Sequence, residues 1–242
     1  KDFRNESIDT THNPEFSMIE FYEAYSDYND MMKLTQEIIV KANKAINNTN
    51  EIEFFNHKIN LKTPWKVMTM KESIKKFGNI DVDKLNDKEL FKLKDQYKSE
   101  YQGDLTRGWM TQLLFEHFAE PKLIQPVFII EHPRETTPLC KGSRKNADLI
   151  ERFELFICGF ELSNGYSELN DPMIQRKLLE EQAKELRQGI EEANPMDEDF
   201  IKAIEQGMPP TSGVGIGIDR LTMVLTGNNS IKDVLFFPMM KN

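Results

Sequence analysis

Apolar positions recur at helical spacing along several stretches of the chain. The clearest stretch covers residues 27–46, where apolar residues three or four positions apart define one face that packs on a core. The residues of this face are Met31, Leu34, Ile38, Ala42 and Ala45. Similar patterns predict further helices over residues 69–77, 87–97, 106–119, 172–193 and 198–206.

Segments with strand character lie between these helices, bounded by turn-forming residues. They are residues 16–25, 123–131, 151–158, 160–169, 212–216 and 233–237. The strands gather toward both ends of the chain and helices fill the middle, which favours a mostly antiparallel sheet with packed helices over regular β-α-β alternation. The sequence therefore predicts an α+β fold whose helical middle part is an insertion on the sheet.

Composition narrows the class of protein. The 242 residues, 39% hydrophobic and 29% charged, are typical of a globular chain. No run of about 18 apolar residues predicts a membrane span. The polar first residues lack the apolar stretch of a secretory signal, and Cys140 and Cys158 are too few for a disulfide framework, so we expect a cytoplasmic setting. The formal net charge of −9 argues against a general phosphate-binding surface, so contacts with nucleic acid must be local.

The first candidate site segment, residues 4–25, reads as strand, loop and strand. Alternate residues of a strand share a face, so Arg4 and Glu6 point the same way on the first strand, while Ile19 and Phe21 of the second face the core. The other face of the second strand combines Phe16, Met18, Glu20 and Tyr22. This mixture suits a ligand that is partly flat and partly charged. The alternative is an amphipathic hairpin whose charges pair across the strands.

The second segment, residues 152–171, carries carboxylates among bulky apolar residues, where charges seldom lie without a partner or a metal. Asn164, Tyr166 and Glu168 alternate along one strand face and suit a polar cationic ligand. Glu154 and Glu161 suit Mg²⁺, which takes oxygen ligands and commonly uses one or two carboxylates plus phosphates. In the alternative interpretation, basic residues neutralise these acids. Those basic residues are Arg152, Lys141 and Arg144.

The third segment reads GVGIGIDR and places Gly213, Gly215 and Gly217 on one strand face. A face without side chains lets a flat or phosphorylated ligand approach the backbone. The G-x-G-x-G spacing excludes the dinucleotide fingerprint, which needs G-x-G-x-x-G in a β-α-β unit. Arg220 follows at the start of a helix, where its guanidinium suits a phosphate. Glycines that serve a tight bend are the alternative.

Three motifs in this order resemble the lysine-specific branch of the class II aminoacyl-tRNA synthetases. FRNE followed by HNPEF is similar to the family's motif 2, ELSNGYSELND to its amino-acid pocket, and GVGIGIDR to its motif 3. The resemblance runs from about Phe3 to the C-terminus. It implies that residues 1–242 form the catalytic domain from motif 2 onward, while motif 1 and an N-terminal anticodon-binding OB domain are absent from this sequence.

The resemblance implies that the enzyme joins L-lysine to the α-phosphate of ATP, with Mg²⁺, and passes the lysyl group to tRNA(Lys), as a homodimer. Arg4 would contact the α-phosphate and the lysine carboxylate. Phe16 would stack on adenine, with Arg220 on the other face and near the γ-phosphate. The implied ATP site comprises Arg4, Glu6, His12, Asn13, Phe16, Glu154, Glu161, Gly217 and Arg220, with Glu154 and Glu161 as magnesium ligands.

The implied amino-acid pocket is anionic, as a substrate that ends in an ammonium requires. Glu168, assisted by Tyr22, would meet that ammonium; Asn164 and Tyr166 would line the pocket, and Glu20 would support the amino groups. Two alternatives stay open. One is the paralogous ligase that attaches a lysine-type amino acid to elongation factor P, and the other is a non-catalytic module that binds lysine without activating it.

Overall fold

The computed structural model describes residues 1–5, 7–94, 106–187 and 196–239. Its helices are α1 (Tyr28–Asn47), α2 (Met70–Gly78), α3 (Asp87–Lys92), α4 (Arg107–Phe118), α5 (Pro172–Arg187), α6 (Glu198–Glu205) and α7 (Ile218–Thr226). Its strands are β1 (Asp2–Phe3), β2 (Glu15–Phe16), β3 (Met18–Ala24), β4 (Glu51–Phe54), β5 (His57–Asn60), β6 (Lys66–Thr69), β7 (Val127–Pro133), β8 (Leu149–Ile157), β9 (Phe160–Ser167) and β10 (Thr211–Gly217). Short 3₁₀ turns are η1 (Val82–Lys84), η3 (Glu120–Lys122), η4 (Arg134–Thr136) and η5 (Ile231–Asp233).

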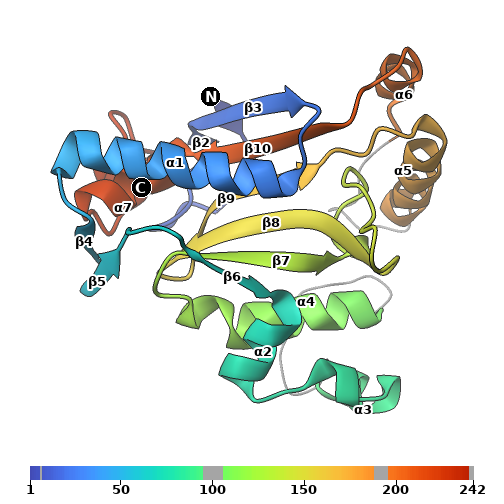
Figure 1. Ribbon diagram of the computed structural model, residues 1–242, viewed down its shortest axis with the longest axis horizontal. Coiled ribbons are helices and arrows are strands. Elements are labelled where there is room, and N and C mark those ends of the chain that lie inside the picture. Colours follow the sequence, from blue (N-terminus) through green and yellow to red (C-terminus); the bar gives the residue numbers. More distant parts are fainter. Residues whose placement is uncertain (6, 95–105, 188–195, 240–242) are drawn as a thin grey trace.

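A six-stranded sheet in the order β3-β10-β9-β8-β7-β6 forms the centre of the molecule (Figure 1). Its neighbouring strands pair antiparallel, except that β6 and β7 run parallel. The parallel pair needs a long crossover, which α2, α3 and α4 supply between β6 and β7. The predicted α+β fold, a mostly antiparallel sheet flanked by helices, is confirmed.

Each face of the sheet packs against different helices. On one face Val214 and Ile216 of β10 join a core with α1 and α7. On the opposite face Val127, Ile129 and Phe156 pack with α2 and α4, which cover the β7 side of the sheet. The glycines of β10 alternate with Val214 and Ile216, so they point to this second face at the β9 side. The candidate site opens there.

Capping residues explain why the predicted helices begin where they do. Asp27 accepts from Asn29 N and forms a capping box at the start of α1, and Thr69 forms another at the start of α2. Bounds of α1, α2, α4 and α6 agree with the predicted ones within one residue. Helix α3 ends at Lys92, and parts of the predicted helices 87–97 and 172–193 lie outside the described residues.

The buried face of α1 differs from the predicted one. Met31 is buried as expected, but Ala45 is exposed, and the buried line also includes Thr35, Ile39 and Asn43. Asn43 Nδ2 donates to Thr49 O, and its Oδ1 accepts from Asn47 at 2.9 Å. Burial of these hydrogen-bonded polar residues turns the helix relative to the face that apolar spacing alone predicts.

Several local predictions are wrong. Strand β1 ends at Phe3, so Arg4 follows the first strand instead of lying in it, and Glu6 lies outside the described residues. Ile19 is 46% exposed because β3 is an edge strand. Residues 233–237 form no strand, since the 3₁₀ turn η5 ends at Asp233. The β4–β5 hairpin and β6 are not among the predicted strands.

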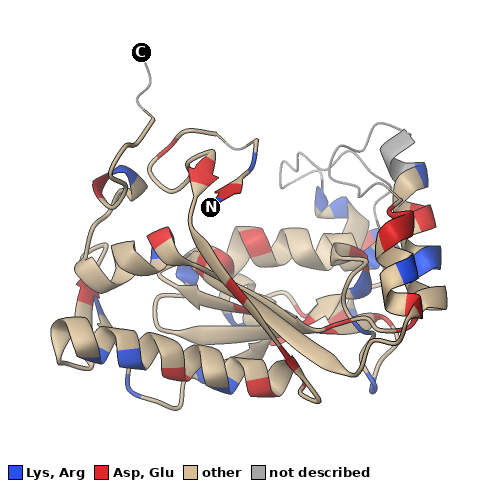
Figure 2. Ribbon diagram, turned by 90° about the horizontal axis from the view of Figure 1, so that it is seen from above, with Lys and Arg blue, Asp and Glu red and all other residues tan. Residues whose placement is uncertain are grey.

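Acidic and basic residues are mixed along the helices. Figure 2 shows basic and acidic segments interspersed along the helices, as in α1, where Asp30 pairs with Lys33 and Glu37 with Lys41. Such exposed pairs contribute little stability, about 0–1 kcal/mol each. Among the residues that the structure describes, no helix has the length and apolar character needed to cross a bilayer.

Candidate functional site

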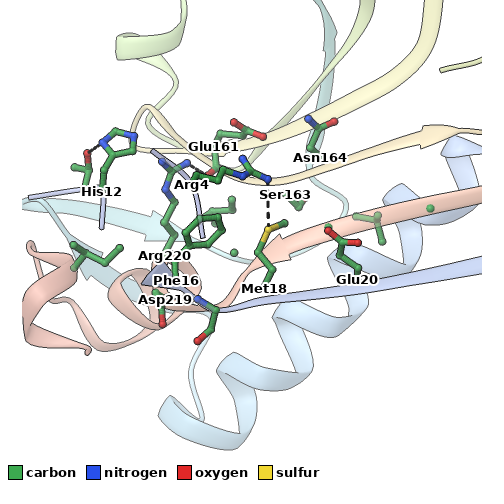
Figure 3. A pocket seen from close by; sticks show the side chains of 18 of the residues that line it. Arg4, His12, Phe16, Met18, Glu20, Glu161, Ser163, Asn164, Asp219 and Arg220 are labelled. Carbon is green, nitrogen blue, oxygen red and sulfur yellow. Dashed lines mark hydrogen bonds between the residues drawn. The ribbon is translucent and has the colours of Figure 1, made fainter. Parts of the chain in front are cut away.

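The three segments singled out in the sequence meet at one cavity of about 370 Å³ on the β3-β10-β9 part of the sheet. Most of the candidate residues line it, and Figure 3 shows several of them pointing toward one another across the cavity. The candidate residues that line it are Arg4, His12, Asn13, Phe16, Glu20, Tyr22, Glu161, Asn164, Tyr166, Glu168, Gly217 and Arg220. Glu154, in contrast, is a buried residue that does not line the cavity.

The strand register explains how these side chains share one face. Two cross-strand rows run over the sheet, and in each row residues on neighbouring strands lie opposite one another. One row consists of Tyr22, Gly213, Tyr166 and Arg152, and the next of Glu20, Gly215, Asn164 and Glu154. The two rows are two residues apart along each strand, and side chains alternate along a strand, so both rows point to the same side of the sheet. The antiparallel sheet therefore collects these polar groups on one surface.

The glycines of β10 make room for the side chains beside them. A Cβ built on Gly213 would lie 2.5 Å from Glu168 Oε1 and 2.5 Å from the Tyr22 ring. A Cβ on Gly215 would lie 2.8 Å from Met18 Cε. All three glycines lie within the regular strand Thr211–Gly217, so the tight-bend alternative is wrong. Gly213 and Gly215 allow neighbouring side chains close to the backbone, and the approach of a ligand to this face stays a prediction.

One end of the cavity is acidic. Burial, and then the charge of Glu20, raise the pKa of Glu168 to about 7. Backbone hydrogen bonds hold Glu168 in place: its N–H donates to Thr211 O at 2.8 Å, and it pairs with Cys140 in an isolated β-bridge. Burial and the charges of Glu20 and Glu168 raise the pKa of Tyr22, whose hydroxyl donates to Glu20 at 3.4 Å. This end suits a cation.

The other end of the cavity is basic and aromatic. The Arg4 guanidinium lies 5.2 Å from the centre of the Phe16 ring, and its Nη2 is 3.9 Å from Met18 Sδ. Arg220 donates from Nη1 to Glu161 O at 2.9 Å, which fixes its guanidinium beside the cavity. In this structure Arg4 therefore occupies a face of the Phe16 ring. Two arginines and an aromatic ring that line one end of a cavity suit a ligand that combines phosphate with a flat group.

A tight turn shapes the loop between β1 and β2. Asp9 accepts from Thr11 N and His12 N, each at 2.7 Å, and from His12 Nδ1 at 3.0 Å. Burial acts in the opposite direction, but these hydrogen bonds hold the pKa of Asp9 well below its usual range. Asn13 is buried and donates to Glu15 O at 2.6 Å, so it also stabilises the loop. This loop places His12 at the cavity wall.

Asp219 is a site residue that the sequence analysis missed. Its Oδ2 accepts from Ser17 N at 2.6 Å, and Ile218 N donates to Ser17 O at 2.9 Å. These two bonds tie the start of α7 to the strand that carries the Phe16 side of the cavity. The signal was present, because Asp219 directly precedes Arg220 in GVGIGIDR.

Carboxylates gather where β8 and β9 meet the end of α4. Burial, and then the charge of Glu154, raise the pKa of Glu161 to about 7. Burial and nearby acids, Glu116 first and then Glu154 and Glu161, raise the pKa of Glu120 to about 8. Glu120, which the sequence analysis did not single out, belongs to η3. A divalent cation would relieve this repulsion between acids.

The two candidate carboxylates would supply only part of a magnesium shell. Among the described residues, no group of three or more histidine, cysteine, aspartate or glutamate side chains is arranged to hold a metal ion. Two carboxylates, Glu154 and Glu161, are the number Mg²⁺ commonly uses when phosphates and water complete its shell. Glu154 also has a partner, since Arg152 donates to its Oε1.

One of the three basic residues in the alternative interpretation does pair with a candidate carboxylate. Arg152 pairs with Glu154, as that alternative requires. Arg144 instead bonds Glu151 at 2.7 Å and Asp27 at 3.1 Å, and Lys141 donates to Asn170 at 3.0 Å. Glu161 and Glu168 both line the cavity.

The chain is similar to proteins of one known family along its whole length. A family model described as tRNA synthetases class II (D, K and N) matches residues 1–241. A lysine--tRNA ligase of Methanoculleus marisnigri is 50% identical over the whole chain and 48% of its own length. Lysine--tRNA ligase 2 of Methanosarcina mazei is 48% identical over the whole chain and 47% of its length, and the lysine--tRNA ligase of Saccharolobus solfataricus 46% identical over the whole chain and 49% of its length. The chain thus spans about half the length of the curated relatives it matches.

Proposed function

Because the chain belongs to the class II tRNA synthetases (D, K and N), we propose that it is the catalytic domain, from motif 2 onward, of an ATP-dependent lysine–tRNA ligase. In this proposal the domain activates L-lysine to lysyl-adenylate and transfers the lysyl group to the 3′ end of tRNA(Lys). The observation that carries the proposal is the opposite charge of the two ends of this cavity. Glu168 lies at one end, and Arg4 and Arg220 lie at the other.

The acidic end selects the amino acid. The side-chain ammonium of lysine binds Glu168, with Tyr22 beside it, and Tyr166 lines the pocket. Glu20 and Asn164 face the amino-acid backbone groups in the next row of the sheet. A cavity with buried polar partners rejects ligands that leave those partners unpaired, and such rejection can reach about 10⁴-fold. An aspartate substrate would meet two carboxylates here and is excluded by charge.

The basic end holds the nucleotide. Arg4 contacts the α-phosphate and the lysine carboxylate, so that it brings nucleophile and electrophile together and stabilises the negative charge that develops at phosphorus. Phe16 stacks on adenine once Arg4 turns toward phosphate, and Arg220 covers the other face of the base near the γ-phosphate. Gly217 lets the nucleotide approach the strand, because nothing lies closer than 3.8 Å to a Cβ built there.

Three further groups complete the proposed ATP site. His12 and Asn13 belong to the loop at the cavity wall, where His12 meets phosphate or base and Asn13 holds the loop. Glu6, outside the described residues, orients Arg4 or the adenylate. Glu154 and Glu161 hold Mg²⁺, which when bound neutralises the triphosphate and the leaving pyrophosphate.

The remaining parts of the proposal concern the whole protein. We expect it to work as a homodimer in the cytoplasm, with tRNA(Lys) as the acceptor of the lysyl group. Since the formal net charge of the chain is −9, tRNA contacts must be confined to a local patch or to another part of the protein.

Amino-acid-dependent exchange of pyrophosphate into ATP tests the proposal in the intact protein. We expect exchange with L-lysine and Mg²⁺, and none above background with aspartate or asparagine. Charging of tRNA(Lys), measured beside modification of elongation factor P, then identifies the acceptor. Lysine binding without exchange would contradict catalysis and would favour a non-catalytic module, while transfer only to the protein acceptor would favour the paralogous ligase.

A further inference from the structure

A buried arginine, Arg152, lies beside the cavity wall on β8. Its own row places it opposite Tyr166, and the next row places Glu154 opposite Asn164. Only 13% of the Arg152 side chain is exposed. A guanidinium so far from water needs an acceptor for its donors, because a buried charge without partners is costly.

Three acceptors surround this guanidinium. Its Nε donates to Asn164 Oδ1 at 3.1 Å, its Nη1 donates to Thr136 Oγ1 at 3.1 Å, and its Nη2 donates to Glu154 Oε1. Thr136 gives its own hydrogen to Pro133 O at 2.8 Å, which leaves a lone pair for the arginine. Every bond in this set therefore has a fixed direction.

That direction settles how the Asn164 amide is turned. An arginine side chain has donors and no acceptor, so the Asn164 atom that meets Nε must be the oxygen. A flipped amide would place N–H against N–H. The nitrogen, Nδ2, then lies on the other side of the amide, and Asn164 lines the cavity (Figure 3).

We propose that Arg152 is a positioning residue that fixes the Asn164 amide with its NH₂ group toward the cavity, where this group binds the substrate carboxylate. This assignment rests on the proposed function. Asn164 pairs with Gly215, which lies between Gly213 and Gly217 along β10. Gly213 lies beside Glu168, and Gly217 lies beside Arg220. A lysine whose ammonium meets Glu168 therefore extends its carboxylate past Asn164 toward the arginines.

Asn164→Asp in the intact protein tests the orientation by the sign of its effect. The isosteric carboxylate keeps the bond from Arg152 but replaces a donor by an acceptor facing the cavity. Binding of L-lysine alone, by calorimetry without ATP or Mg²⁺, is expected to weaken about 10- to 150-fold, the range for a lost hydrogen bond to a charged group. Lysinamide, which has no carboxylate, should bind the variant at least as tightly as it binds the unchanged protein.

The same measurement has an opposite outcome if the amide oxygen faces the cavity. That oxygen would accept from the α-ammonium, so Asn164→Asp would tighten binding of both ligands and overturn the proposal. Absence of lysine binding by the unchanged protein would overturn the proposed function and this assignment together, whereas lysine binding that Asn164→Asp leaves unchanged would overturn the assignment alone.

A double-mutant cycle tests whether Arg152 acts through Asn164. Arg152→Lys keeps the positive charge beside Glu154 but removes the guanidinium, which reaches Asn164 as well. Arg152→Lys should weaken L-lysine binding about 10-fold in the unchanged background and less than about 2-fold when Asn164 is already alanine. Equal effects in both backgrounds would overturn the positioning role.

A matched control separates this effect from general loss of an arginine bond. Arg176 donates to Glu198 at 2.9 and 3.0 Å on α5 and α6, apart from the cavity lining. Arg176→Lys is expected to leave L-lysine binding unchanged. A melting curve for each variant confirms that lysine affinity is compared between folded proteins. Equal weakening by Arg176→Lys and Arg152→Lys would also overturn the proposal.

Discussion

Gly213→Ala offers the sharpest test of the glycine face. The added Cβ would lie 2.5 Å from both Glu168 Oε1 and the Tyr22 ring, closer than carbon and oxygen atoms can approach. The ring is on the edge strand and can turn outward, but Glu168 must move its carboxylate out of the position that meets the ammonium. Loss of one hydrogen bond to a charged group corresponds to about 1.5–3 kcal/mol, or about 10- to 150-fold in affinity for lysine.

The other glycines of β10 give matched controls. On Gly215 the nearest atom is the flexible end of Met18 at 2.8 Å, and on Gly217 the nearest atoms are at 3.8 Å. We expect KM for lysine to rise strongly for Gly213→Ala, modestly for Gly215→Ala and not at all for Gly217→Ala. Pyrophosphate exchange at saturating ATP measures this order. An equal effect of Gly213→Ala and Gly217→Ala on KM for lysine would refute the steric argument.

Three further outcomes follow from the site and the core. Because burial raises the pKa of Glu168 to about 7, its carboxylate ionises between about pH 6 and pH 8. Calorimetry should therefore find lysine affinity about 10-fold higher at pH 8 than at pH 6, and Glu168→Gln should abolish this difference. Arg144→Met leaves the 5%-exposed side chain of Glu151 unpaired and should cost about 1–3 kcal/mol in urea unfolding, whereas Lys71→Met, at an exposed pair, should cost less than about 1 kcal/mol. Phe16→Leu should raise KM for ATP in pyrophosphate exchange and leave KM for lysine unchanged.

The pH prediction has a counterpart in stability. The folded pKa of Glu168 lies above its unfolded value, so the folded protein binds the extra proton between about pH 4.5 and 7. Stability from this group is therefore present below that window and declines as the pH rises through it. Removal of the charge by Glu168→Gln should stabilise the protein at pH 8 more than at pH 5.

Alternation along single strands was enough to predict which side chains share a face. Gly213, Gly215 and Gly217 follow one another at every second position of β10, and Asn164 and Tyr166 do the same in β9, so each set lies on one side of its strand whatever the strand pairs with. Glu168 lies one residue beyond β9 and joins this surface through its bridge to Cys140. Likewise, Asp27 and Thr69 mark the starts of helices through local hydrogen bonds that depend on a few neighbouring residues.

Contacts between distant segments could not be predicted from local pattern. Nothing near Arg152 in the sequence says whether it meets Glu154, Asn164 or neither, because the answer depends on which strands pair and in what register. The β4–β5 hairpin was not predicted, because its turn has a weak sequence signal. Phe55 and Asn56 both have positive φ in the structure, but only the asparagine is a residue type that favours such a turn. Burial of Asn43 depends instead on a local partner, Thr49 O, that the spacing of apolar residues does not reveal.

The central claim is that one cavity holds a cationic amino acid at Glu168 and a nucleotide at Arg4 and Arg220. Lysine-dependent exchange of pyrophosphate into ATP by Glu168→Gln, measured in the intact protein beside ATP binding, tests it most directly. We predict that exchange falls at least about 100-fold while the affinity for ATP changes less than about 2-fold, since the lost charge lies at the far end of the cavity. Exchange at the unchanged rate, or loss of ATP binding together with lysine binding, would contradict the account.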